Sequence, residues 1–264
     1  MIELNKIYNE DCLKTMAKMP DEFIDLVITS PPYDDLREYN GYKFKFKKIA
    51  KELTRVLKQG GIIMWNVSDS VKNGSETLTS FKQAIYFKEK CSLLMHDTMI
   101  YLKDKSVFPE KKRYGQIFEY MFVLSKSKPK TYNLIKDRKN KYLKVTSGTE
   151  RLKGGDTVRQ NSIHLNEYGC RDNVWLYSTG YQKSAKDLIA YEHPAIMPER
   201  LAADHIISWS NKGDLVYDPF MGSGTTAKMC IQYDRNWIGS ETSKEYYNIA
   251  EKRLKPYINQ TKLF

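Results

Sequence analysis

The sequence lacks the features that mark several large classes of protein. It has only four cysteines, Cys12, Cys91, Cys170 and Cys230, and they lie far apart without a CxxC pair. This spacing indicates neither a zinc site nor a disulfide framework, so we expect no bound metal. No apolar run approaches the roughly 18 residues that a membrane-spanning helix needs, and the amino terminus carries no export signal. We therefore expect a cytoplasmic protein without a membrane partner.

No Walker pattern occurs either, so nucleoside triphosphate hydrolysis has no support. What the sequence has in excess is positive charge, with 43 lysines and arginines against 32 acidic residues and a net charge of +11. The excess favours a polyanionic partner, although a solvated lysine-rich surface would give the same sum. The length of 264 residues suits one α/β domain with an insertion, or two small domains.

A stretch near the amino terminus, residues 25–33, joins an apolar strand to a rigid turn, Ser30-Pro31-Pro32-Tyr33. Two prolines fix φ twice and remove two N–H donors, so the chain neither continues as a strand nor enters a helix. The turn is therefore expected at the carboxyl end of a strand, where open α/β sheets place ligands. The Ser30 hydroxyl and the Pro31 carbonyl can accept hydrogen bonds from an amino group, and Tyr33 offers a ring for stacking. We interpret the stretch as a site for the exocyclic amine of a nucleobase. A proline-rich turn without function is the alternative.

The surrounding pattern alternates between helical and extended periodicity. A helix of about 46–57 and a buried strand at 62–67 follow the first stretch, which makes a βαβ unit. Two apolar runs, 96–102 and 118–124, are candidates for edge strands of the same sheet. Further helices are expected at 81–92, 199–209 and 244–254.

A second stretch, Gly213 to Thr226, reads as a strand, a Gly-x-Gly turn at Gly222 and Gly224, and a helix from about Thr225. Glycines let backbone N–H groups approach a ligand, and the helix N-terminus adds a favourable dipole. Glu241 ends the next strand, where nucleoside-binding folds hold a ribose diol. Since Gly222-x-Gly224-x-x-Ala227 also fits the dinucleotide fingerprint, a nicotinamide enzyme competes for this stretch.

Composition shifts at residue 126, where a basic segment with interleaved tyrosines begins. Its periodicity is weak, and it has the electrostatic footprint expected of nucleic-acid contact. A charged, partly disordered linker is the alternative reading. The candidate DNA-contacting residues are Lys136, Arg138, Lys139, Lys141, Lys144, Arg151, Lys153 and Arg159.

Together the two motifs resemble those of the amino-methyltransferases that modify DNA with S-adenosylmethionine. Thr29 to Tyr33 is similar to their catalytic (D/N/S)PP(Y/F) motif, and Asp218 to Thr225 is similar to their FxGxG cofactor loop. His193-Pro194-Ala195 resembles the segment just ahead of that loop. With the catalytic motif first, the order is that of the β class. The resemblance implies a circularly permuted Rossmann-like sheet of seven strands, with helices on both faces.

The resemblance also implies how the chain is divided and what its motifs do. Residues 1–125 would form the catalytic half of the methyltransferase domain and residues 172–264 the half that binds S-adenosylmethionine, with a basic target-recognition insert at 126–171. A base flipped out of double-stranded DNA would meet the catalytic residues Ser30, Pro31, Pro32 and Tyr33. The implied cofactor-binding residues are Asp11, Asp218, Pro219, Phe220, Gly222, Ser223, Gly224, Thr225 and Glu241. Asp11 serves equally well as a helix N-cap.

Serine in the first motif position resembles the members that methylate cytosine N4, with adenine N6 as the alternative target. No cysteine is preceded by proline, so the Pro-Cys nucleophile of cytosine ring-carbon methyltransferases is missing. Two other classes stay open, a non-catalytic DNA-binding module and a dinucleotide-dependent oxidoreductase. The first leaves both motifs unexplained, and the second leaves the Ser-Pro-Pro-Tyr turn and the basic insert unexplained. A homodimer and a companion restriction endonuclease are further partners to test.

Overall fold

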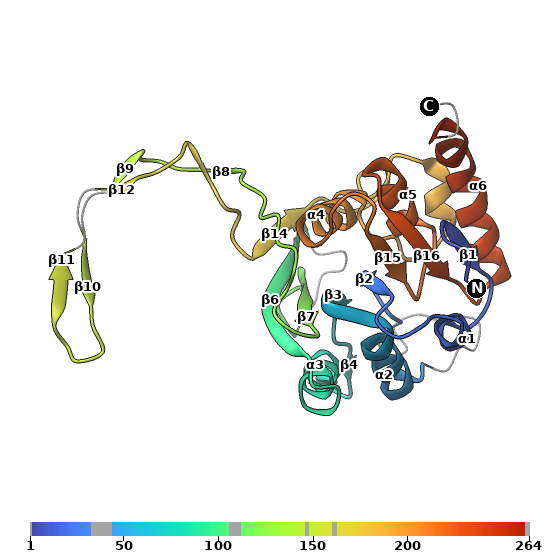
Figure 1. The fold of residues 1–264 in the computed structure, drawn as a ribbon, viewed down its shortest axis with the longest axis horizontal. Coiled ribbons are helices and arrows are strands. Elements are labelled where there is room, and N and C mark those ends of the chain that lie inside the picture. Colours follow the sequence, from blue (N-terminus) through green and yellow to red (C-terminus); the bar gives the residue numbers. More distant parts are fainter. Residues whose placement is uncertain (1, 33–43, 106–111, 146–147, 160–162, 262–264) are drawn as a thin grey trace. The chain divides into compact units, whose positions relative to one another are not determined.

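The chain divides into two units in the computed structural model, which describes residues 2–32, 44–105, 112–145, 148–159 and 163–261 (Figure 1). The larger unit combines Met1–Asn133 with Asn173–Phe264, and the smaller unit is Leu134–Asp172. The smaller unit begins eight residues later than the insert predicted from the sequence at residue 126. The reason is that residues 126–133 are tied to the larger unit, where Lys130 N donates to Gly60 O at 3.0 Å and Asn133 N to Ser208 O at 2.8 Å.

The larger unit is built on an eight-stranded sheet in the order β1-β16-β15-β2-β3-β7-β6-β14. All its strands are parallel except β7, which is antiparallel to both neighbours. The sheet has one strand more than the resemblance implied. Its strands are β1 (Lys6–Tyr8), β2 (Ile24–Thr29), β3 (Leu57–Val67), β6 (Leu94–Lys103), β7 (Phe118–Ser125), β14 (Val174–Tyr177), β15 (Leu215–Asp218) and β16 (Asn236–Ser240).

The runs expected at the edge of the sheet are strands, but neither lies at its edge. β14 returns from the smaller unit and pairs in parallel with β6, from Val174 opposite Ile100 to Tyr177 opposite Lys103. It therefore takes the edge position, which the sequence pattern before the insert could not reveal. The stretch after β3 contains the short hairpin β4 (Val71–Lys72) and β5 (Ser75–Glu76).

Helices cover both faces of the sheet, which confirms the predicted Rossmann-like α/β class (Figure 1). On one face, Ile49, Leu53 and Val56 of α2 are fully buried and join Trp65 and Val27 in the main apolar core, as the helical periodicity predicts. One side carries α1 (Cys12–Ala17), α2 (Phe46–Val56) and α3 (Thr79–Lys90), and the other α4 (Glu199–Trp209), α5 (Thr225–Gln232) and α6 (Lys244–Thr261). A 3-10 helix, Leu188–Glu192, precedes α4.

The smaller unit contains three antiparallel strand pairs, each enclosed by the pair before it in the sequence, whereas the alternative interpretation was a charged, partly disordered linker. β8 (Arg138–Lys139) pairs with β13 (Tyr168–Gly169), and β9 (Lys144–Val145) with β12 (Ile163–His164). β10 (Thr149–Arg151) pairs with β11 (Thr157–Arg159). The described residues of the smaller unit therefore form an antiparallel ribbon.

Within the described residues, no helix is long and apolar enough to cross a membrane. The same residues contain no group of three or more His, Cys, Asp or Glu side chains placed to hold a metal ion. The cytoplasmic location and the absence of a metal both stay predictions from the sequence.

The carboxylate of Asp218 connects the ends of β15 and β2. Thr29 Oγ1, at the end of β2, donates to Asp218 Oδ1 at 2.9 Å, and Thr226 Oγ1, in the first turn of α5, donates to Oδ2 at 2.6 Å. Phe220 N donates to Oδ1 at 3.0 Å. Asp218 is only 4% exposed, and this burial raises its pKa to about 6 although the three donors oppose the shift. The carboxylate thus fixes both sequence motifs relative to one another.

This burial predicts a pH-dependent stability that Asp218→Asn should remove. Because the pKa of about 6 in the fold lies above the value of about 3.9 in unfolded chains, the folded state binds more protons between these values. The free energy of unfolding contributed by Asp218 is therefore greatest below about pH 4 and falls by up to about 3 kcal/mol as the pH rises through 6. Urea unfolding of wild type and Asp218→Asn from pH 4 to pH 7.5 measures the difference. Parallel pH dependence of the two proteins would contradict the prediction.

Candidate active site

The predicted site residues follow the carboxyl ends of four adjacent strands. In the order β1-β16-β15-β2, these ends lead to Asp11, Glu241, the glycine turn and the Ser30 turn. Because the strands are parallel, their carboxyl ends lie on the same side of the sheet, and the four segments meet there, where open α/β sheets bind ligands. The fold therefore brings together motifs that lie nearly 200 residues apart in the chain.

The Ser30 turn begins where β2 ends at Thr29. The Thr29 side chain is held by Asp218, and the Ser30 hydroxyl oxygen lies 3.5 Å from Nδ2 of Asn66, the donor, on β3. Pro31 is buried and Pro32 half-buried. Tyr33, predicted to stack on the target base, lies outside the described residues.

The glycine turn between β15 and α5 is shaped by contacts with protein side chains. Gly222 has φ +51°, and a Cβ there would lie 3.1 Å from Nε2 of His193. Gly224 has φ +81°, and its Cβ would lie 3.2 Å from Cβ of Ala250 on α6. Both positions need glycine for the backbone and for packing. A bulky substitution at Gly224 would therefore disturb helix packing first, and it cannot serve as a clean probe of ligand binding.

Glu241 lies beside this turn, immediately after β16. Its Oε2 accepts from Gly222 N at 2.9 Å and its Oε1 from Ser243 N at 2.8 Å. The residue is 9% exposed, and burial raises the pKa of its carboxyl group although the backbone donors oppose the shift. Each carboxylate oxygen can accept more than one hydrogen bond. Both oxygens therefore retain capacity for ligand hydroxyl groups.

The other predicted cofactor residues make contacts within the protein. Asp11 caps α1 by accepting from Leu13 N at 2.8 Å, which is the structural alternative foreseen from the sequence. Ser223 and Thr225 are bound by Arg253, whose Nη1 donates to their hydroxyl oxygens at 3.2 Å and 3.0 Å. Pro219 is buried, and the half-buried ring of Phe220 lies 5.7 Å, between centroids, from that of Phe44. Asp11, Ser223 and Thr225 thus each have a hydrogen-bond partner within the protein.

A buried ion network behind the glycine turn was not predicted. Lys228 Nζ binds Asp187 and Glu199, both at 2.6 Å, and Arg253 binds the same two carboxylates at 3.0 Å and 2.7 Å. Burial opposes ionisation of Asp187, but hydrogen bonds from Lys228, Tyr257 and Arg253 lower its pKa to about 2. Arg253 Nη1 also donates to Ser223 O at 2.9 Å, so the network supports the turn directly. One feature of the sequence could have indicated this network: Lys228 is a charged residue within a helix whose neighbouring positions are all buried.

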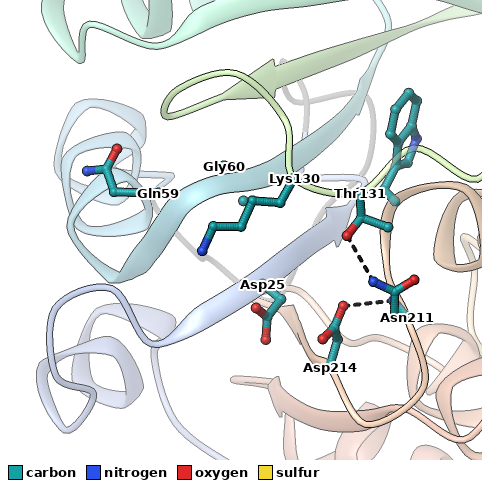
Figure 2. A pocket seen from close by; sticks show the side chains of 9 residues that line it. Asp25, Gln59, Gly60, Lys130, Thr131, Asn211 and Asp214 are labelled. Atoms are coloured by element: carbon teal, nitrogen blue, oxygen red, sulfur yellow. Dashed lines mark hydrogen bonds between the residues drawn. The ribbon is translucent and has the colours of Figure 1, made fainter.

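A pocket of about 250 Å³ lies at the opposite, amino ends of the strands. Figure 2 shows the side chains that line it. Asp25 lies at the start of β2 and Asp214 just before β15, whereas the predicted site follows the ends of these strands. Asn211 closes one side, since its Nδ2 donates to Thr131 Oγ1 at 3.1 Å and its backbone N to Asp214 Oδ2 at 2.7 Å. The pocket is therefore separate from the candidate active site.

A parallel sheet with a serine–proline turn and a glycine turn at adjacent strand ends defines a Rossmann-like methyltransferase. The model of the DNA methylase family matches residues 24–252, so the chain belongs to this family. The orphan methyltransferase M.BamHII of Bacillus amyloliquefaciens is 58% identical over 239 residues, which cover 89% of this chain and 90% of the relative. The DNA adenine methyltransferase YhdJ of Escherichia coli strain K12 is 28% identical over 265 residues, 96% of this chain and 83% of the relative.

Solved structures share the fold. PvuII DNA methyltransferase, cytosine-N4-specific, superposes with a TM-score of 0.69 at 18% identity, over 97% of this chain and 91% of that chain. The M1.HpyAVI–SAM complex superposes with a TM-score of 0.62 at 24% identity, over 94% of this chain and 98% of that chain. The chain is thus a DNA methyltransferase of the group that acts on cytosine N4 or adenine N6, as the sequence motifs predicted.

Arg253→Met should destabilise the protein, because it removes a fully buried cation and leaves two half-buried carboxylates with Lys228 alone. Breaking a buried ion pair typically lowers the free energy of unfolding by about 3–5 kcal/mol. Lys252→Met is the matched control, since Lys252 is the exposed neighbour on α6 and should change stability by no more than about 0.5 kcal/mol. Urea unfolding at pH 7 measures both. Equal effects of the two substitutions would contradict the role of the network.

Proposed function

We propose that this DNA methyltransferase transfers a methyl group from S-adenosylmethionine to the exocyclic amine of a base flipped out of double-stranded DNA, with cytosine N4 as the first candidate. The observation that carries the proposal is the Thr29–Asp218 hydrogen bond of 2.9 Å. It fixes the Ser30 turn, which would hold the base, beside the glycine turn, which would hold the cofactor. Catalysis then consists mainly of positioning two bound reactants.

The residues beside the glycine turn fit S-adenosylmethionine. Glu241 has oxygens with capacity for the two ribose hydroxyls, and Phe220 offers a half-buried ring next to them. When bound, the cofactor supplies an electrophilic methyl group, which bonds to the amine nitrogen as the carbon–sulfur bond breaks and its electron pair stays on sulfur. Within this arrangement, Gly222 N fixes the Glu241 carboxylate, and Arg253 fixes the turn from behind.

The Ser30 turn would act on the amine. The Ser30 hydroxyl oxygen and the Pro31 carbonyl accept its N–H groups and thereby raise the electron density on nitrogen. Tyr33 would stack on the ring, and the proton that nitrogen loses after the transfer goes to water. No covalent adduct with the base is needed, which agrees with the absence of a Pro-Cys dipeptide.

The choice of base rests on Ser30. Serine in this position favours cytosine N4, as argued from the sequence, and the PvuII enzyme that shares the fold is named cytosine-N4-specific. Adenine N6 is the second candidate, because a relative at 28% identity is named a DNA adenine methyltransferase. A homodimer and a companion restriction endonuclease stay predictions from the sequence.

The ribbon of the smaller unit supports a proposal for how the chain contacts DNA. In an antiparallel pair, opposite residues share a face and successive residues alternate. Thr149 lies opposite Arg159 and Arg151 opposite Thr157, so these four share one face, whereas Glu150 and Val158 share the other. We infer that the arginine face meets DNA, since the major groove admits a two-stranded ribbon. Most of the other candidate DNA-contacting residues are exposed, namely Lys136, Lys139, Lys141 and Lys153. Arg138 forms an ion pair with Asp172 at 3.2 Å. Lys144 lies in β9, opposite His164 of β12.

Ser30→Ala and Glu241→Gln should separate the two halves of the site. Ser30→Ala removes an acceptor for the amine, so it should lose most of the methylation rate and keep near-normal affinity for S-adenosylmethionine. Glu241→Gln should weaken that affinity by about 1–3 kcal/mol, as expected for an altered bond to a desolvated hydroxyl. Calorimetry measures binding, and tritium transfer to unmethylated genomic DNA with nucleoside mass spectrometry measures rate and product.

Three results would count against this assignment. They are full activity of Ser30→Ala, unchanged affinity of Glu241→Gln, and a product methylated on a ring carbon. Tyr33→Ala should resemble Ser30→Ala, because loss of a stacking surface costs roughly 1–3 kcal/mol per base.

Arg151→Gln/Arg159→Gln should flatten the salt dependence of DNA binding. Each phosphate contact contributes about −0.9 to the slope of log affinity against log salt, so the slope should change by about two. The matched control is Lys252→Gln/Lys255→Gln, which removes two exposed charges from α6. Fluorescence anisotropy with duplex DNA between 50 and 300 mM salt measures the slopes. If both double variants behave alike, the arginine face does not contact DNA.

A further inference from the structure

A row of polar side chains extends away from Ser30 across three neighbouring strands. Lys103 on β6 pairs with Glu119 Oε1 on β7 at 2.7 Å, and Asn66 Nδ2 on β3 donates to Glu119 Oε2 at 2.6 Å. The same Nδ2 lies 3.5 Å from the hydroxyl oxygen of Ser30. The register explains the alignment, because Thr29 at the end of β2 lies opposite Trp65 on β3, and the residues that follow them in the chain are Ser30 and Asn66.

The amide of Asn66 is held in one orientation. Glu119, ion-paired with Lys103, presents acceptor oxygens, so the NH₂ end of the amide faces it and the carbonyl end cannot. Asn66 is 3% exposed and Glu119 is 9% exposed, so solvent contributes little to either group. The pair therefore determines where the Asn66 carbonyl oxygen lies.

That oxygen, Asn66 Oδ1, is buried and has no hydrogen-bond partner among the residues that the structure describes. A buried acceptor without a donor is costly, so it calls for an explanation. Oδ1 and Nδ2 are bonded to the same carbon, which places the unpartnered oxygen within a few Å of the Ser30 hydroxyl. The site of the proposed chemistry thus contains an acceptor that needs a donor from a ligand.

The chemistry of the bases identifies this donor. Cytosine presents an exocyclic amine at N4 and adenine one at N6, whereas thymine and guanine present carbonyl oxygens at the equivalent positions. The carbonyl oxygen of a keto base beside Asn66 Oδ1 would place two hydrogen-bond acceptors together with no donor hydrogen between them. An amine carries two N–H groups, so one can be shared between Oδ1 and the neighbouring Ser30 oxygen while the other points to the Pro31 carbonyl.

We propose that Asn66 is a further catalytic residue of this methyltransferase, which accepts an N–H of the target amine and selects amino bases over keto bases. Glu119 and Lys103 are positioning residues that hold its amide in the required orientation. The inference rests on the proposed function and adds residues from strands that carry neither sequence motif. The Pro31 carbonyl accepts the second N–H as the amine nitrogen becomes positively charged.

The test uses the full chain with Asn66→Ala and Glu119→Gln. Loss of a hydrogen bond to a group that develops charge should slow single-turnover methylation of unmethylated genomic DNA by about 10- to 100-fold in Asn66→Ala. The dissociation constant of S-adenosylmethionine, measured by calorimetry, should stay within about twofold of wild type. In Glu119→Gln, the new NH₂ group can donate to Asn66 Oδ1, so methylation should slow although the melting temperature does not fall.

Gln83→Leu is the matched control. Gln83 is a buried amide that accepts from Nε1 of Trp65, the residue before Asn66 on β3, and its loss should lower stability but leave the methylation rate unchanged. A wild-type rate in either Asn66→Ala or Glu119→Gln overturns the inference. If Asn66→Ala fails to fold, Glu119→Gln decides alone. A wild-type protein that forms no methylated nucleoside would instead overturn the proposed function.

Discussion

The arrangement of the candidate site depends on one buried carboxylate. Asp218 accepts hydrogen bonds from the end of β2, from the backbone of the glycine turn and from the first turn of α5. The register between β15 and β2 contains two residue pairs, Val216 with Leu26 and Tyr217 with Val27. Beyond these pairs a side chain, rather than the backbone ladder, connects the strands. This is the point where an open sheet can leave a crevice for a ligand.

A second set of charges holds the opposite side of the glycine turn. The two cations and two carboxylates behind it come from the 3-10 helix region and from α4, α5 and α6, so their positions depend on the packing of all these elements. Buried ion pairs contribute little net stability but are costly to break. Their effect here is to fix the turn before any ligand binds, which reduces the entropy cost of binding.

The sequence was most informative where local pattern determines structure. Helix α4 has the predicted bounds, Glu199–Trp209, and α5 begins at the predicted Thr225. The alternation of strands and helices predicted the fold class, and the order of the motifs predicted the family. Asp11 illustrates the limit, since the same residue type suits a helix cap and a ligand contact, and the structure shows the cap.

What sequence reasoning missed depends on partners far apart in the chain. Asn66 and Glu119 are 53 residues apart, and Arg253 and Asp187 are 66 apart, so no periodicity relates them. The packing role of Gly224 was also missed, because the side chain that would meet its Cβ belongs to a later helix. The two faces of the ribbon depend on a strand register that weak periodicity does not reveal.

The order of strands in the sheet also constrains how the protein is made. In the sheet, β1 has β16 as its neighbour, and Lys6 lies opposite Ile238. During synthesis from the amino terminus, β2, β3 and β7 can pair early, whereas β1 has nothing to pair with until almost the whole chain has left the ribosome. A nascent chain that ends before β15 would hold the Ser30 turn beside an open, apolar strand edge, which is prone to aggregation. The late synthesis of β15 and β16 therefore covers the exposed edges of both β1 and β2.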